Sequence, residues 1–386
     1  MSSAANSLFV TGILVPDMIA DLHWSKAQFA ALGGLSLITA FFFPIAGRLG
    51  DLLGVWRTAL IGIVALPLSY LAFSFMTGPI WQFAAIQLAM GILTITTATL
   101  IYCRVAVRYV QKARGIALAI VASGPAVTGM IVAPLMNRFV EAHGWRASYQ
   151  ILALYVAIGG MITLWLLPRD RPEPAISGAP RREARKDYPL IFRSKAFWIL
   201  LGAMMLCNLP NIIVLSQLKM ILIGLGIPAA NTSVMLTSLP LGLLAGRFVI
   251  GYCLDRYPSH LVGAFGLALP CIGLFIFASG SSEPWLLTFA TICLGFALGA
   301  EGDIISFVSA RKFGVAVFSS VMGLLTMVIS FSVALGSGLL GLSLKLTGGY
   351  TAYLYGCSMA VLLGGSLIFL LRLCPDPQAS DQPDQS

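Results

Sequence analysis

The stretch IWQFAAIQLAMGILTITTATLIYCRVAV, residues 80–107, carries a single charged side chain, Arg104. A helix of about 20 apolar residues spans the hydrocarbon core of a bilayer, so this stretch predicts a transmembrane helix. Lipid leaves exposed backbone groups without hydrogen-bond partners, which favours helices over irregular chain. Similar apolar runs precede and follow it, at Ser3–Ala20, Ala27–Ala46, Thr58–Thr77, Gly115–Asn137, Ala147–Leu167, Ala196–Leu218, Ala230–Tyr252, Leu261–Ser279, Pro284–Ser309, Val315–Leu344 and Ala352–Leu373.

The composition agrees with a polytopic membrane protein, because 58% of the residues are hydrophobic and only 10% are charged. A soluble domain cannot cover its surface with so few polar groups. We therefore predict an all-α membrane protein with about twelve transmembrane helices in two six-helix halves. The halves are residues 1–167, whose first helix is short, and 196–373. A basic linker, 168–195, joins them, and a tail follows at 374–386.

Lysine and arginine near the helix ends predict the orientation. The loops on one side hold seventeen basic residues and those on the other side five, which are Lys26, Arg138, Arg146, Lys219 and Lys345. We expect the richer side, with both termini and the linker, to be cytoplasmic, and the membrane to be the bacterial inner membrane. The basic residues are scattered over many loops, which argues against nucleic-acid binding. We expect a monomer.

The chain contains an internal repeat. Gly47-Arg48-Leu49-Gly50-Asp51 ends the second run, and Gly251-Tyr252-Cys253-Leu254-Asp255-Arg256 ends the eighth, with the aspartates 204 residues apart. Two copies of a helical unit predict alternating access, with a small-molecule site near the bilayer midplane between the halves.

Enzyme chemistry finds little support in the sequence. The three histidines are in loops, no cysteine pair has CxxC spacing, and no GxxxxGK[ST] motif is present. We therefore expect no catalytic residues, no metal, no cofactor and no ATP-driven motor. A membrane enzyme or a non-transporting sensor is the less favoured class; a sensor would bind ligand without flux.

The chain resembles the major facilitator superfamily over essentially its whole length. The resemblance is carried by the superfamily's loop motif, which matches the residues Gly47-Arg48-Leu49-Gly50-Asp51-Leu52-Leu53-Gly54. Three further stretches narrow the resemblance to its monocarboxylate-porter and oxalate/formate-exchanger branch. They are the stretch from Arg108 to Gly115 with Ser123-Gly124, then Gly144-Trp145-Arg146, and Gly246-Arg247-Phe248-Val249-Ile250-Gly251. The motif departs from the family at Leu52, Val55 and Trp56, where basic residues are common.

The resemblance implies a gating motif made of Gly47, Asp51, Gly54, Arg57, Arg108, Asp255 and Arg256. A loop carboxylate can cap the positive N-terminus of a facing helix. We expect that role for Asp51, with Arg108 as a partner; the alternative is a solvated loop acid.

Four charges, those of Arg104, Arg247, Glu301 and Asp303, lie well inside apolar runs rather than near their ends. Each such charge costs roughly 2.5–3.5 kcal/mol on insertion scales. The resemblance implies that Arg247 contacts a substrate carboxylate, and a guanidinium fork suits that contact. The alternative is a structural pair with Glu301 or Asp303. Arg104 is one turn from Arg108, so we expect it to snorkel to the cytoplasm.

Glu301 and Asp303 project about 200° apart on a helix, on opposite sides of a stripe of glycine and serine. One acid therefore faces the pathway while the other bonds a neighbouring helix. A carboxyl in a partly dry site carries a proton at neutral pH, which makes this pair the candidate for proton coupling. A purely structural role is the alternative.

Further polar side chains are candidates for substrate binding: Asn208, Asn211 and Gln217, around the helix-breaking Pro210, and Tyr102. The function we predict is proton-coupled secondary transport of small organic anions, with monocarboxylates as the expected substrates. The runner-up is proton-driven efflux of amphipathic compounds or drugs. The large apolar interior suggests it, as does Ser123-Gly124-Pro125, which resembles part of the Gly-Pro motif of proton-driven drug exporters but lacks the motif's glycine at Ile120.

Overall fold

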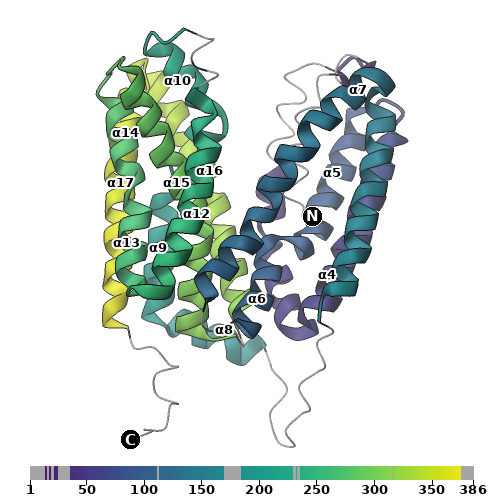
Figure 1. The fold of residues 1–386 in the computed structure, drawn as a ribbon, viewed down its shortest axis with the longest axis horizontal. Helices are drawn as coiled ribbons and strands as arrows, with labels where there is room; N and C mark the ends of the chain where they lie inside the picture. The colour runs from purple at the N-terminus through teal and green to yellow at the C-terminus, as the bar shows by residue number, and fades with distance from the viewer. Residues whose placement is uncertain are drawn as a thin grey trace, which may run out of the picture. The chain divides into compact units, whose positions relative to one another are not determined.

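The computed structural model describes residues 14, 17–18, 21–24, 35–110, 113–168, 184–228, 232, 235–315 and 317–374. Within these residues the chain is helical and has eight helices long and apolar enough to cross a membrane (Figure 1). The predicted run Ser3–Ala20 lies mostly outside the described residues, as do residues 27–34 of the second run.

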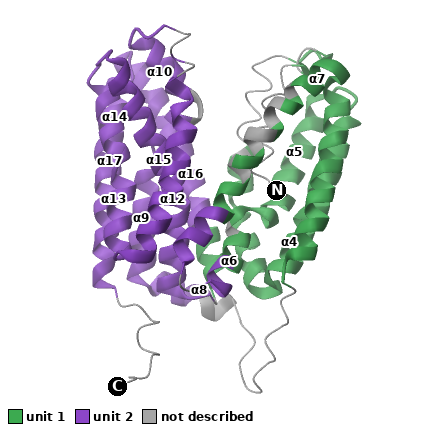
Figure 2. Cartoon of the chain, in the orientation of Figure 1, with its two compact units in different colours: residues 1–105, 121–182, 317–324 green, residues 106–120, 183–316, 325–386 purple. Residues whose placement is uncertain are grey.

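The described helices group into two compact units (Figure 2). Unit 1 is Met1–Val105, Val121–Arg182 and Val317–Leu324; unit 2 is Ala106–Ile120, Glu183–Ala316 and Leu325–Ser386.

The helices of the N-terminal part are α3 (Leu35–Ala40), α4 (Phe43–Ser74), α5 (Ile80–Thr94), the 3-10 turn η2 (Ile95–Thr97), α6 (Thr99–Tyr109) and α7 (Arg114–Leu166). Two of them bend at a glycine with positive φ: α4 at Gly54 (φ 81°) and α7 at Gly144 (φ 76°). Only glycine adopts these angles at little cost. The predicted fifth and sixth runs therefore form the two arms of α7.

An aromatic core holds unit 1 together. Tyr70, Phe73, Phe83 and Tyr149 are at most 2% exposed, and the Phe73 and Tyr149 rings stack with centroids 5.1 Å apart. At the end of this core, Trp145 donates a hydrogen bond to Asp21, which also pairs with Arg146. These two donors lower the pKa of the Asp21 carboxyl, the tryptophan bond contributing most.

The helices of the C-terminal part run beside one another (Figure 1), and all of them except the first residues of α16 belong to unit 2. They are α8 (Ala184–Arg193), α9 (Lys195–Cys207), the π-helical turn η3 (Ile213–Gln217), α10 (Leu218–Gly224), α12 (Ser238–Arg256), α13 (Ser259–Ala268), α14 (Pro270–Ala278), α15 (Pro284–Phe313), α16 (Phe318–Thr347), α17 (Thr351–Phe369) and η4 (Leu370–Leu373). The helix α8 falls inside the predicted basic linker, 168–195, of which residues 169–183 lie outside the described part.

Glycines bring α12 and α15 into backbone contact. A Cβ atom added at Gly246 would lie 2.0 Å from the carbonyl oxygen of Phe296, and one added at Gly299 would lie 2.0 Å from that of Leu243. Small residues at such spacing allow close helix packing in membranes. This contact determines which side chains of the two helices meet.

Candidate functional site

The predicted seventh helix is interrupted at membrane depth. The helix α9 ends at Cys207, and Pro210 follows in a turn before the π-helical residues Ile213–Gln217. Proline has no N–H group, so the carbonyl four residues earlier loses its usual donor. Neighbouring helices supply donors nearby: Tyr353 donates to the Leu209 carbonyl at 2.8 Å, and Ser332 donates to that of Met205.

Asn208 and Asn211, both predicted binding residues, form a directed chain of amides at this break. The Asn208 Nδ2 donates to the carbonyl of Met204 at 2.9 Å and to Oε1 of Glu301 at 2.5 Å. Asn211 Nδ2 in turn donates to Oδ1 of Asn208 at 2.6 Å. A backbone carbonyl only accepts, so Met204 fixes the orientation of the Asn208 amide. A cavity of about 20 Å³, room for about one water, adjoins Asn211 and Glu301.

The two acids of α15 point to different helices. Glu301 contacts Asn208 beside α9, whereas Asp303 lies against α12, with Oδ1 3.9 Å from Nη1 of Arg247. The side chain of Asp303 is 1% exposed and that of Arg247 is 16% exposed. Neither oxygen of Asp303 has a hydrogen-bond partner among the described residues. Their opposed directions agree with the predicted 200° separation.

The backbone contact between α12 and α15 positions this ion pair. Arg247 directly follows Gly246, and Asp303 is one turn after Gly299. Arginine stays charged when buried, so its charge needs an anion nearby. The site can therefore hold either the Asp303 carboxylate or another carboxylate against one guanidinium.

The remaining candidate binding residues are placed elsewhere. Gln217 accepts a hydrogen bond from the Tyr350 hydroxyl at 3.0 Å, within unit 2. Tyr102 belongs to α6 and is half-buried in unit 1. No pattern in the sequence indicated Tyr350, Tyr353 or Ser332, since their partners are more than 100 residues away in the chain.

Asp51 caps the N-terminus of α16, in an arrangement that we call the Asp51 cap. Its carboxylate accepts hydrogen bonds from the backbone N–H of Ser319 (3.1 Å) and of Ser320 (2.7 Å), and from the Ser320 hydroxyl (2.6 Å). Arg104 completes the cap by pairing with the same carboxylate. Our expectation that Arg104 snorkels was wrong: it is 7% exposed because its charge is neutralised locally.

Asp255 makes the equivalent Asp255 cap on the first residues of α7. It accepts from the backbone N–H of Gly115 at 2.7 Å and of Ile116 at 3.2 Å. The capped residues 115 and 319, like the aspartates, are 204 positions apart, so the sequence repeat extends to the hydrogen bonds. That offset was the available signal for Ser319, which we did not predict.

The other residues of the predicted gating motif have simpler surroundings. A Cβ atom at Gly47 would lie 2.1 Å from the Ser319 carbonyl oxygen, and Gly54 makes the bend of α4. Arg57 is exposed, and Arg256 packs over the Tyr252 ring at 4.6 Å. Arg108, expected beside Asp51, is exposed near the ring of Tyr109 instead, because Arg104 is the arginine one turn deeper.

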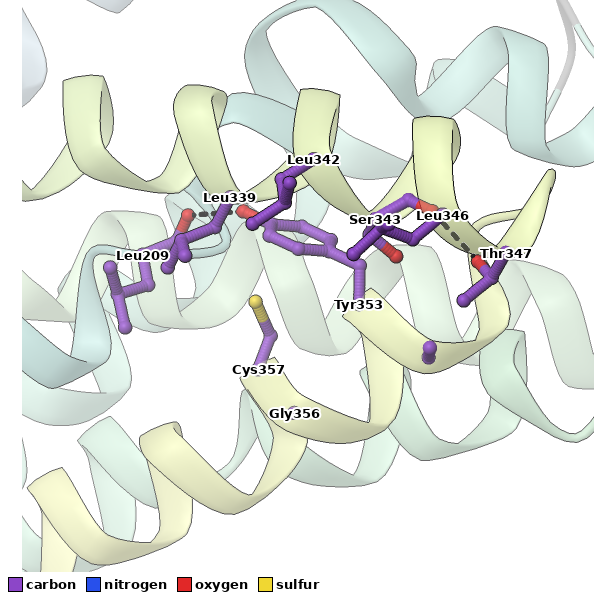
Figure 3. Close-up of a pocket in the computed structure, with 10 residues that line it drawn as sticks. Leu209, Leu339, Leu342, Ser343, Leu346, Thr347, Tyr353, Gly356 and Cys357 are labelled. Atoms are coloured by element: carbon purple, nitrogen blue, oxygen red, sulfur yellow. Dashed lines mark hydrogen bonds between the residues drawn. The ribbon is translucent and has the colours of Figure 1, made fainter.

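A larger cavity lies apart from these charges. It has a volume of about 420 Å³ and is lined mainly by apolar side chains of α16 and α17, including Leu339, Leu342, Leu346 and Cys357 (Figure 3). The Tyr353 ring crosses it toward Leu209 (Figure 3). Among the described residues, no cluster of histidine, cysteine or acidic side chains is suited to a metal ion.

Comparison with known proteins places this geometry in a family. The sequence profile of the Major Facilitator Superfamily matches residues 1–337. Human monocarboxylate transporter 11 is 22% identical, over 93% of this chain and 78% of its own length. Bovine monocarboxylate transporter 13 is 23% identical, over 93% and 84%. The structure of the Escherichia coli fucose:proton symporter FucP superposes with a TM-score of 0.76 at 15% identity, covering 94% of this chain and 96% of that one.

Because the sequence identity to FucP is only 15%, the superposition shows a shared fold and nothing about a shared function. The profile match, in contrast, covers most of the chain and confirms the predicted family and two-half helical architecture. The chain belongs to the Major Facilitator Superfamily and is a membrane transporter.

Proposed function

We propose that this transporter carries small organic anions, with monocarboxylates as its substrate class, by proton-coupled alternating access. The observation that supports this most is the placement of Arg247, whose partly buried guanidinium lies 3.9 Å from the buried carboxylate of Asp303. The similarity to proteins named monocarboxylate transporters agrees with an anionic substrate. The name of FucP, a proton symporter, makes a proton the coupling ion to test first.

Proton and anion transport are coupled in this proposal because the substrate carboxylate and Asp303 compete for the guanidinium of Arg247. A substrate carboxylate binds a guanidinium bidentately, but Asp303 is already 3.9 Å away. Two carboxylates at one guanidinium leave a net negative charge in a medium of low dielectric constant. Protonating Asp303 removes that charge and frees the guanidinium, so proton and anion bind together.

Glu301 is the second candidate for the proton. Glu301 accepts a hydrogen bond from Asn208, which connects α15 to the interruption after α9. A change in the charge of Glu301 therefore alters the contact between these helices. We assign the proton that is coupled directly to the anion to Asp303, and to Glu301 a role in holding the broken helix.

The Asp51 and Asp255 caps serve as latches that stabilise one state of the transport cycle. Each joins a carboxylate to the first amides of a helix, a contact that breaks as a unit when the helix end moves. The side that carries them is the cytoplasmic side in our assignment, which rests on the distribution of basic residues.

Uptake into proteoliposomes tests the proposal. Labelled lactate and pyruvate are offered with and without an inward proton gradient, and we expect saturable uptake that the gradient stimulates. Arg247→Gln abolishes the saturable component, whereas Arg247→Lys, which keeps the charge but loses the fork, raises KM about tenfold or more. Normal uptake by Arg247→Gln, in protein with an unchanged unfolding midpoint, would refute the anion site.

Efflux of amphipathic compounds is the second candidate, and the apolar cavity of about 420 Å³ between α16 and α17 favours it. Its substrates are apolar molecules with one charged end, so lipophilic cationic dyes are suitable probes. Proton-driven dye accumulation in everted vesicles, sensitive to Gly356→Phe but not to Arg247→Gln, would favour this function over anion transport.

A further inference from the structure

A short helix precedes the first long helix of unit 2 and meets it at a corner. The helix α8 ends at Arg193 and α9 begins at Lys195. Ser194 between them has extended backbone angles (φ −75°, ψ 122°), so the two helices do not form one continuous rod. Ile191 is fully buried, and it anchors α8 to the rest of the unit.

Four aromatic side chains cluster at this corner, of which Phe197 is fully buried, Tyr188 is half-buried, and Phe192 and Trp198 are exposed. We call Tyr188, Phe192, Phe197 and Trp198 the aromatic corner. Phe192 is 42% exposed and Trp198 is 55% exposed, with ring centroids 6.4 Å apart. The Trp198 Nε1 donates to the Phe192 carbonyl at 2.8 Å, which fixes the indole at the end of α8. Half-exposed aromatic rings with one polar end are typical of the membrane–water interface.

Two cations accompany the aromatic corner. Arg193 and Lys195 are both exposed, and neither forms a salt bridge within the part of the chain that the structure describes. The α8 sequence adds Arg185 and Lys186 against one acid, Asp187. A basic amphipathic helix next to a membrane-spanning helix attracts anionic lipid, by an amount equivalent to about fivefold in affinity for each lysine or arginine.

We propose that this corner binds the headgroup of an anionic phospholipid, with Arg193 and Lys195 at the phosphate and the aromatic corner at the boundary between headgroups and acyl chains. A soluble phosphate does not explain the exposed rings of Phe192 and Trp198, which need an apolar or interfacial neighbour. The site is independent of the transported substrate.

Trp198 provides the measurement. Purified full-length protein in detergent is titrated with bromine-labelled phosphatidylglycerol or phosphatidylcholine, and the Trp198→Phe variant is subtracted so that only quenching of Trp198 remains. We expect phosphatidylglycerol to reach half-quenching at a concentration about twenty-five times lower, the product of two fivefold contributions. Sodium chloride near 1 M should remove most of this preference, because it screens the charges.

Substitutions test whether Arg193 and Lys195 are the cations that bind the lipid headgroup. Arg193→Gln with Lys195→Gln should bring the two lipids to equal half-quenching. The matched pair Lys219→Gln with Lys345→Gln, also exposed but in α10 and in the last turn of α16, should keep the preference. Glycerol phosphate, the headgroup anion without acyl chains, should leave the quenching unchanged. Equal quenching by both lipids in the natural sequence, a preference that survives loss of Arg193 and Lys195 or persists in salt, or displacement by glycerol phosphate would each overturn the proposal.

Discussion

The buried carboxyls Asp303 and Glu301 are two residues apart but have different partners, which separates their roles. Asp303→Asn keeps the shape and removes the charge that competes for Arg247. We expect this variant still to exchange internal for external lactate. Its rate of uptake driven by a proton gradient should be lower by about tenfold or more. Glu301→Gln still accepts a hydrogen bond from Asn208 and should keep gradient-driven uptake within about threefold. The opposite result would transfer the coupling role to Glu301.

For single residues, the sequence indicates which buried charges belong to the candidate site, but it does not indicate which side chains they contact. A charge inside an apolar run is visible from hydropathy alone, which drew attention to Arg247, Glu301 and Asp303. Their partners depend on which helices pack together. Arg104 shows the limit, since the aspartate that neutralises it is 53 positions away in the chain.

The glycine contact between α12 and α15 permits a test with an internal control. Gly299→Ala places a methyl group 2.0 Å from the Leu243 carbonyl oxygen, so the two helices must separate. Overpacking of this kind costs about 1–3 kcal/mol and moves Asp303 away from Arg247. Gly302→Ala, between the two acids on the same helix, has no atom within 4 Å of the added carbon. We expect a lower unfolding midpoint and a higher KM for Gly299→Ala only; equal effects would contradict a packing role.

The two caps differ by one buried arginine, which predicts unequal stability effects. Asp51→Ala leaves Arg104 buried without its anion, a loss of about 3–5 kcal/mol. Asp255→Ala removes a helix cap alone and costs about 1 kcal/mol. Denaturant titration in detergent measures both. The double variant Asp51→Ala with Arg104→Leu should recover part of the loss, and additivity would contradict a direct pair.

Apolar runs placed most elements correctly, because lipid imposes one length and one backbone geometry on each span. The bends at Gly54 and Gly144 were not predicted, since the sequence alone does not distinguish a glycine with positive φ from one inside a helix. Pro210 indicated a break after α9, but the π-helical turn that follows depends on donors from α16 and α17.

For the whole chain, the repeat of 204 residues predicts that the two sequence halves hold each other through the caps. Asp51 bonds Ser319 and Ser320, and Asp255 bonds Gly115 and Ile116, so each carboxylate reaches amides from the other half of the sequence. If the chain is divided between Ile176 and Ser177 and the fragments are co-expressed, the tagged first fragment should recover the second.

Removing both carboxylates, Asp51→Ala and Asp255→Ala, should lower that recovery about tenfold or more, because the two losses act on the same association. Glu301→Gln provides the matched control, since the Glu301 bond to Asn208 lies entirely within the second fragment and should not change recovery. Recovery that is indifferent to both caps would mean that other contacts hold the halves, and the latch role proposed for Asp51 and Asp255 would then be wrong.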